Sequence, residues 1–176
     1  SIMLAQSVSL NDRHRFPNMI NDEDDGSWQY NYLIFDGRDF DENFGPLVRK
    51  GAYIEDASIL FCPFQLDPFH SYATPENPWP NLPLVDTRAG YARRYHLSGK
   101  SLSQFRGSPA IFADVLHYPD VIKSAHKTGG NAAYADGHAR WVKDNGKLLR
   151  NDLTRPFTPD DNSVMEEIWD LLNRGE

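Results

Sequence analysis

The fold is decided by one stretch of the sequence, His126-Lys-Thr-Gly-Gly-Asn-Ala-Ala-Tyr-Ala-Asp136-Gly137-His138-Ala-Arg-Trp141-Val142. Asp136-Gly137 is a dipeptide typical of a two-residue type I′ turn, because glycine adopts positive φ without steric cost and aspartate tolerates it. We therefore expect strands over residues 131–135 and 138–143 that pair as a β-hairpin.

The side chains of this expected hairpin divide between two faces. A two-residue turn places Tyr134 opposite Ala139 and Ala132 opposite Trp141, and side chains alternate along each strand. The face that carries Tyr134 and Trp141 is apolar, so we expect it to point into the core. On the other face, His138 is expected to lie in solvent.

The same stretch contains a His-x9-Asp-Gly pattern, formed by His126, Asp136 and Gly137. This pattern resembles the C-terminal signature of prepilin-like (pseudopilin-like) proteins, which resemble type II secretion pseudopilins at their N-termini. Those proteins begin with a cleavable leader and a long apolar helix, and neither is found in this sequence. The resemblance therefore implies the soluble head of such a protein, without its anchoring helix.

Three further segments extend the resemblance over roughly residues 44–142. In chain order they are Gly45-Pro-Leu-Val-Arg-Lys-Gly-Ala-Tyr-Ile54, Ile59-Leu-Phe-Cys62-Pro63 and Pro109-Ala-Ile-Phe-Ala-Asp114. The second segment resembles a family strand that ends in Cys-Pro. The third resembles the strand whose final aspartate precedes the histidine of the pattern.

The resemblance implies a structural protein of the cell envelope and not an enzyme. Its N-terminal helix would anchor it in the inner membrane, with the head on the periplasmic or extracellular side. Its expected partners are other pilin-like subunits or secretion machinery, and no cofactor is implied. We expect the following residues to determine the fold of the head: Cys62, Pro63, Asp114, His126, Tyr134, Asp136, Gly137 and Trp141.

The composition is that of a single globular domain spanning residues 1–176. Its hydrophobic fraction is 40% and its formal net charge is −7. The absence of a basic run argues against nucleic-acid binding, which needs a positively charged face. The single cysteine, Cys62, excludes an intrachain disulfide. Because it lies in an apolar run, we expect a small buried side chain and not a reactive thiol.

Apolar patterning along the rest of the chain predicts an α+β fold, with an N-terminal helix on an antiparallel sheet and a C-terminal helix. Six of the chain's twelve prolines fall in residues 63–90, which predicts a long loop there. Ser163 and Glu166 have capping-box spacing at the start of the last helix. The expected helices are 1–13, 44–50 and 163–174, and the expected strands outside the hairpin are 28–35, 58–62, 91–96 and 109–113.

Two alternatives concern metal ions. A metal-dependent hydrolase could use His126, Asp136 and His138, since zinc needs several such groups within about 2.0–2.2 Å of one point. The expected hairpin opposes this, because it sends His138 to solvent and uses Asp136 in the turn. The acidic run at residues 21–26 could bind calcium, but EF-hand spacing is absent and a solvated loop is preferred.

A further alternative concerns the aromatic residues of the long loop. Phe64, Phe69, Tyr72 and Trp79 could form a platform that binds a carbohydrate or a peptide. Aromatic residues in a long loop more often cover a hydrophobic core, and we prefer that interpretation. A glycan-binding module remains an alternative to the structural protein.

Overall fold

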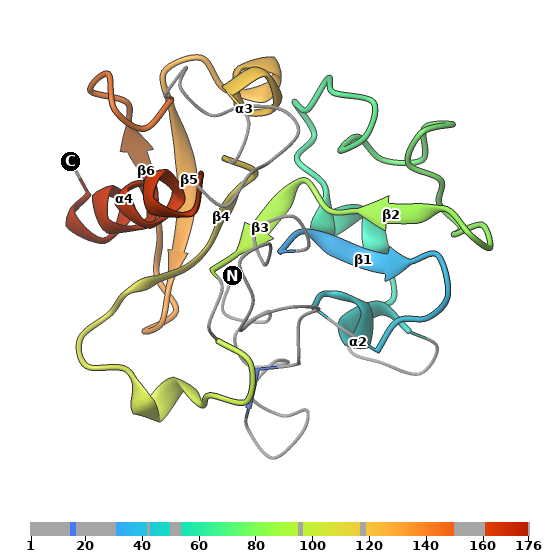
Figure 1. Ribbon diagram of the computed structural model, residues 1–176, viewed down its shortest axis with the longest axis horizontal. Helices are drawn as coiled ribbons and strands as arrows, with labels where there is room; N and C mark the ends of the chain where they lie inside the picture. Colours follow the sequence, from blue (N-terminus) through green and yellow to red (C-terminus); the bar gives the residue numbers. More distant parts are fainter. Residues whose placement is uncertain are drawn as a thin grey trace.

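The computed structural model describes residues 15–16, 31–41, 43–49, 54–94, 97–116, 119–149 and 161–175. The expected helix at 1–13 and the acidic run at 21–26 lie outside these residues. The chain has an α+β fold in which two antiparallel sheets lie side by side (Figure 1). Within the described ranges, none of the helices has the length and apolarity required to span a membrane.

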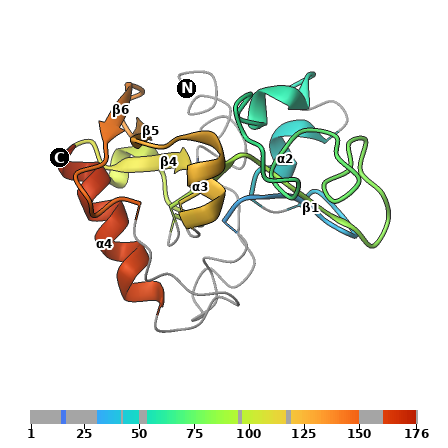
Figure 2. The ribbon, with the colours of Figure 1, turned by 90° about the horizontal axis from the view of Figure 1, so that it is seen from above.

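The larger sheet contains four antiparallel strands in the order β3 (Tyr91–Arg93), β4 (Ala110–Asp114), β5 (Gly129–Tyr134) and β6 (Ala139–Lys143). Helix α4 (Asp161–Arg174) lies along one face of this sheet (Figure 2). Its apolar stripe, which includes Ile168 and Trp169, is buried against β4, β5 and β6. The expected C-terminal helix is confirmed, but it begins before Ser163, so the predicted capping box is wrong.

The smaller sheet pairs β1 (Leu33–Asp36) with β2 (Asp86–Arg88). Only Ala89 and Gly90 separate β2 from β3, so one nearly continuous segment passes from one sheet to the other (Figure 1). Ala89 N donates to Tyr32 O at 2.7 Å. This segment fixes the two sheets relative to each other. The strand expected at 28–35 begins only at Leu33 within the described residues.

Besides α4, the described residues contain four short helical segments, one of which is a 3₁₀ helix at Leu102–Gln104. The short helix expected at 44–50 is confirmed as α2 (Gly45–Val48). Helix α3 (Pro119–Ala125) was not predicted, because seven residues show little periodicity. The strand expected at 58–62 is wrong: residues Ala57–Leu60 form a 3₁₀ helix. Asp56 caps it by accepting a hydrogen bond from Ser58 N at 2.9 Å, and local capping thus outweighs the apolar run.

The long loop expected at 63–90 is confirmed for residues 63–85, but it ends at β2, which was not predicted. A buried asparagine holds the loop in place. Asn77 Nδ2 donates to Ser71 O at 3.0 Å and to Arg88 O at 2.8 Å, while Asn77 Oδ1 accepts from Arg88 N at 2.7 Å. Trp79 packs edge-on against Phe40, as expected of a residue that covers the core.

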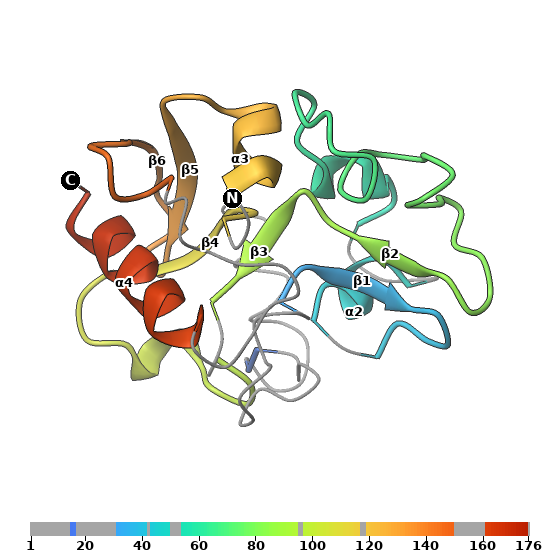
Figure 3. The same ribbon diagram turned by 45° about the horizontal axis from the view of Figure 1, so that its top comes forward.

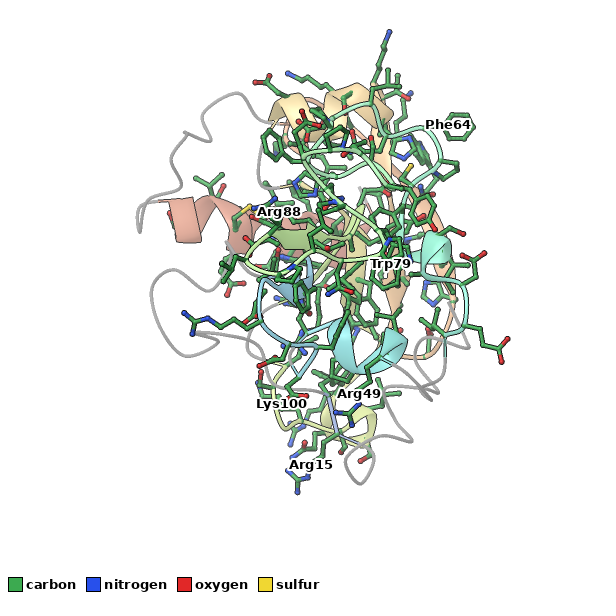
Figure 4. All side chains as sticks on the ribbon, turned by 90° about the vertical axis from the view of Figure 1, so that its right-hand side faces the viewer. Arg15, Arg49, Phe64, Trp79, Arg88 and Lys100 are labelled. Carbon is green, nitrogen blue, oxygen red and sulfur yellow. The ribbon has the colours of Figure 1, made fainter. Side chains whose placement is uncertain are left out.

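Phe64 does not follow the expectation that the loop's aromatic residues cover the core. It is 69% exposed and points away from the fold, whereas Trp79 lies against it (Figure 4). Phe69 and Tyr72 are nearly half exposed. The interpretation as a core cover is therefore correct for Trp79 and wrong for Phe64.

Candidate functional site

The hairpin forms, but its loop has three residues and not two. Tyr134 N donates to His138 O at 2.9 Å, and Gly137 N donates to Tyr134 O at 2.9 Å. Gly137 has φ +90°, whereas Asp136 is not among the residues with positive φ. A type I′ turn needs positive φ at both central residues, so this loop is the three-residue kind that uses one glycine. The predicted turn type is therefore wrong.

The three-residue loop shifts the pairing by one residue, so that Asn131 lies opposite Trp141 and Ala132 opposite Arg140. Tyr134 is buried against α4, as expected. Trp141 lies on the opposite face and is 45% exposed, so its predicted place in the core is wrong. Val142 takes that place, because one step of register moves each β6 side chain to the other face.

Arg140 and His138 cover the buried tyrosine of the hairpin. Arg140 Nε donates to Tyr134 Oη at 2.7 Å, and Tyr134 Oη donates to Leu172 O at 2.6 Å. The His138 ring stacks on the Tyr134 ring at a centroid distance of 4.2 Å. His138 is exposed, as expected, but it lies on the face that carries α4. These contacts fasten the turn end of the hairpin to the C-terminal helix.

Three residues from separate segments meet at the other end of the hairpin. His126 Nε2 lies 3.3 Å from Asp114 Oδ2 and 3.5 Å from Cys62 Sγ. One side-chain donor atom from each of Cys62, Asp114 and His126 lies within 4.8 Å of the other two. These residues come from the Cys-Pro segment, the end of β4 and the start of the His-x9-Asp-Gly pattern. We call them the Cys-Asp-His cluster.

Asp114 belongs to a row of side chains across the larger sheet. Tyr91 lies opposite Asp114 on β3, and Asn131 follows on β5, opposite Trp141 on β6. Asn131 donates to Asp114 Oδ2 from its backbone N at 2.6 Å and from its Nδ2 at 3.1 Å. The preceding residue, Ala113, packs toward α4. Because side chains alternate along a strand, the cluster lies on the face away from α4.

Cys62 reaches the cluster because a glycine lets two backbone segments approach closely. Gly90 N donates to Leu60 O at 2.9 Å. A Cβ atom at position 90 would lie 2.5 Å from Cys62 N, which is far inside van der Waals contact. Only glycine therefore fits at the point where the Cys-Pro segment crosses the start of β3.

Helix α3 lies between β5 and the start of the long loop (Figure 3). His126 comes directly after this helix, and Gln65 joins the helix to the Cys-Pro turn. The buried Gln65 donates from Nε2 to Val121 O at 3.1 Å, and its Oε1 accepts from the Ser124 hydroxyl. His126 follows the last turn of α3, and its edge packs on Trp141 at a centroid distance of 5.2 Å. Sequence reasoning missed Gln65 and Asn131, since neither has a motif.

Burial dominates the electrostatics of the cluster. It raises the pKa of Asp114, against the opposing effects of Asn131 and His126. It also raises the pKa of the Cys62 thiol, although the nearby backbone N–H groups of Phe64 and Gln65 act in the other direction. Burial, with the nearby Cys62 and Asp114, raises the pKa of Tyr91 to about 12.

The geometry does not suit nucleophilic catalysis by Cys62. In a Cys-His-Asp relay the imidazole uses one ring nitrogen for the thiol and the other for the carboxylate. Here Nε2 of His126 faces both partners. A reactive thiol also needs a lowered pKa, and that of Cys62 is raised. Sulfur, nitrogen and oxygen donors around one point are instead suited to holding a transition-metal ion.

The alternative metal site at His126, Asp136 and His138 is wrong. His138 Nδ1 lies 2.5 Å from Asp136 Oδ1 at the turn, and His126 lies beyond the far end of β5. Among the described residues, the Cys-Asp-His cluster is the one group of three or more histidine, cysteine and acidic side chains with this proximity. The six residues of β5 hold His126 too far from Asp136 and His138 for the three side chains to bind one ion.

Comparisons of the chain with family models, curated proteins and solved structures find no significant match. The resemblance to prepilin-like proteins therefore depends on the sequence motifs of this chain alone.

Proposed function

We propose that this chain is the head of a pilin-like protein, and that it serves as a structural subunit of the cell envelope and not as an enzyme. One observation supports this proposal most. Cys62, Asp114 and His126, each from a different segment of the resemblance, meet at one point of the fold. Such a meeting is expected if the three segments share one structural role in the head.

The burial of the cluster favours a structural role over catalysis. The side chain of Asp114 is 3% exposed and that of His126 is 12% exposed, which leaves little access for a substrate. Through these residues the Cys-Pro turn, the end of β4 and the end of α3 are held together. In this role the three residues fix the long loop to the larger sheet, of which the hairpin is a part.

In this proposal the head is held at the inner membrane by a helix that precedes it, on the periplasmic or extracellular side. Its partners are other pilin-like subunits or the secretion machinery. Nucleic acid is not a partner, because the net charge of −7 would oppose binding to phosphates. The exposed side chain of Phe64 lies in the long loop, on a part of the head that is open to such contacts (Figure 4).

The experiment that tests this proposal uses the full gene product with its native N-terminus. We expect it to fractionate with the inner membrane and to have lost a leader, as shown by N-terminal sequencing. The matched control is the same polypeptide begun at Ser1, which should leave the membrane fraction. Recovery of the full product as an unprocessed protein outside the membrane would contradict the proposal.

Glycan binding is a second candidate, which the exposure of Phe64, Phe69 and Tyr72 favours. Aromatic rings that are open to solvent can stack on sugar rings, whereas rings in a core cannot. A glycan array tests this function by comparing the wild type with Phe64→Ala. Trp79, which is packed in the fold, is not changed in either protein. Binding that is lost in the variant would favour a glycan-binding module.

A further inference from the structure

We propose that Cys62, Asp114 and His126 bind one divalent transition-metal ion, and that Zn²⁺ is the ion best suited to these donors. This inference goes beyond the structural role proposed above, which requires no metal. The ion would join the Cys-Pro turn, the end of β4 and the end of α3, three segments that are far apart in the sequence.

Two of the three separations within the cluster match those of a tetrahedral zinc site, and the third, from Cys62 Sγ to the Asp114 carboxylate, lies within 4.8 Å. Zinc binds sulfur at about 2.3 Å, nitrogen at about 2.0–2.1 Å and carboxylate oxygen at about 2.0–2.2 Å. A tetrahedral angle then separates sulfur from nitrogen by about 3.6 Å and nitrogen from oxygen by about 3.4 Å. The observed separations are 3.5 Å for Cys62 Sγ to His126 Nε2 and 3.3 Å for His126 Nε2 to Asp114 Oδ2.

The charges of the three side chains balance a divalent ion. A thiolate and a carboxylate together carry two negative charges, and a neutral imidazole carries none. Burying such charges is costly unless they are paired or bind a metal. One divalent cation would make the site neutral as a whole, which a monovalent cation would not.

One oxygen of the cluster lacks a hydrogen bond. Asp114 Oδ1 is buried and has no hydrogen-bond partner among the described residues, whereas Oδ2 accepts two bonds from Asn131. Asp114 as a whole is 2% exposed. A buried polar atom without a partner is rare in folded proteins, and a bound ion beside the carboxylate would compensate its burial.

The groups around the cluster orient its donors in the way that metal sites require. Asn131 fixes the carboxylate of Asp114, and the Trp141 ring fixes the orientation of His126. Such supporting contacts set the geometry of metal ligands and contribute to affinity.

The mixture of donors selects the class of ion. Calcium and magnesium prefer sites built entirely from oxygen atoms, so a thiolate disfavours them. Sulfur and imidazole nitrogen suit zinc, and cobalt(II) binds the same geometry and can be followed by its absorption. Three protein ligands leave one tetrahedral position, which a water molecule would fill.

The test uses the complete chain, stripped of metal with a chelator and titrated with Co²⁺. We expect a thiolate-to-cobalt absorption band in the near ultraviolet that saturates at one equivalent and disappears when Zn²⁺ is added. Because Cys62 is the only cysteine of the chain, such a band can arise only from this site. A wild-type protein that gives no band on saturation with Co²⁺ would overturn the proposal.

Variants then assign the ligands. Cys62→Ser should abolish the band, and His126→Ala and Asp114→Asn should weaken Co²⁺ binding at least tenfold. The matched control is His138→Ala, which removes an exposed imidazole that also lies beside a carboxylate and should leave the titration unchanged. The assignment would be overturned if Cys62→Ser kept the band. It would also be overturned if His138→Ala lost the band while the three ligand variants kept it.

The ligand variants remove buried groups, so a second measurement on the wild type does not depend on their folding. Zn²⁺ at 100 times its Kd should raise the Tm by about 5–10 °C, and a chelator should reverse the rise. An unchanged Tm at saturating zinc would contradict a structural ion at this junction. Failure here would leave the membrane fractionation of the full gene product, and hence the pilin-like proposal, unaffected.

Discussion

Asp114 carries a buried carboxyl group whose two oxygen atoms have unequal surroundings. Oδ2 accepts two hydrogen bonds from Asn131 and faces His126, whereas Oδ1 is buried without a hydrogen bond among the described residues. Tyr91 lies beside it on the neighbouring strand. Hydrogen bonds therefore compensate the burial of the Asp114 carboxyl group only in part. The titration of Tyr91 reports on the same buried environment.

Tyr91 offers a prediction about pH. Its pKa is raised from 10.0 to about 12, chiefly by burial. Between these values the unfolded chain releases the phenol proton while the folded protein keeps it, so the free energy of unfolding should fall as pH rises through this window. Absorbance at 295 nm should show one tyrosine ionising near pH 12 that is missing in Tyr91→Phe. Identical titrations of the two proteins would count against the buried environment.

Gly137 offers a prediction about backbone strain. Its φ of +90° is strongly disfavoured for a β-branched residue, so Gly137→Val should destabilise the protein by more than about 1 kcal/mol. Urea unfolding measures the change. The control is Ala139→Val on the adjacent exposed strand position, where a β-branched residue is tolerated. Equal unfolding midpoints for wild type and Gly137→Val would show that the turn is wrongly assigned.

Two backbone segments meet closely where the Cys-Pro segment crosses the start of β3. The hydrogen bond from Gly90 N to Leu60 O joins the segment before Cys62 to the link between the two sheets. Gln65 then joins the Cys-Pro turn to α3. Each contact lies between elements that are distant in sequence, and together they bring Cys62 and His126 to the same end of β4.

This crossing predicts that Gly90→Ala is poorly tolerated. The added methyl group would lie 2.5 Å from Cys62 N, and we expect a loss of about 1–3 kcal/mol in the free energy of unfolding. Gly130→Ala on β5 is the matched control, because its methyl group would find its nearest atom at 3.5 Å, an ordinary contact. Chemical denaturation compares the two, and equal stabilities would contradict the close approach.

The same elements mark the limit of prediction from the sequence. The helix at 163–174 and the strand at 109–113 were predictable because their apolar periodicity matches the burial they receive. The hairpin was predictable from Asp136-Gly137, but its register was not, since this dipeptide fits loops of two or three residues. The segment at 58–62 was wrongly predicted as a strand, because a short apolar run does not distinguish a strand from a capped 3₁₀ turn.

On the scale of the whole molecule, the two sheets are held together by the segment from β2 to β3, and the cluster lies beside that segment. Cys62, Asp114 and His126 were each predicted to determine the fold, but their meeting could not be predicted. The number of residues between Cys62, Asp114 and His126 does not predict their distance in space, because a long loop and an unpredicted helix lie between them. The convergence depends on Gln65, Gly90 and Asn131, none of which belongs to a motif.

The most direct test of this convergence is a double-mutant cycle on Asp114→Asn and His126→Ala, measured by urea unfolding in the presence of a chelator. Residues in contact show coupling energies of about 0.5–3 kcal/mol, and we expect a value in this range. The control cycle pairs Asp114→Asn with His138→Ala, whose effects should add. Strict additivity of Asp114→Asn and His126→Ala would contradict the meeting of these side chains, and with it the account given for the pattern.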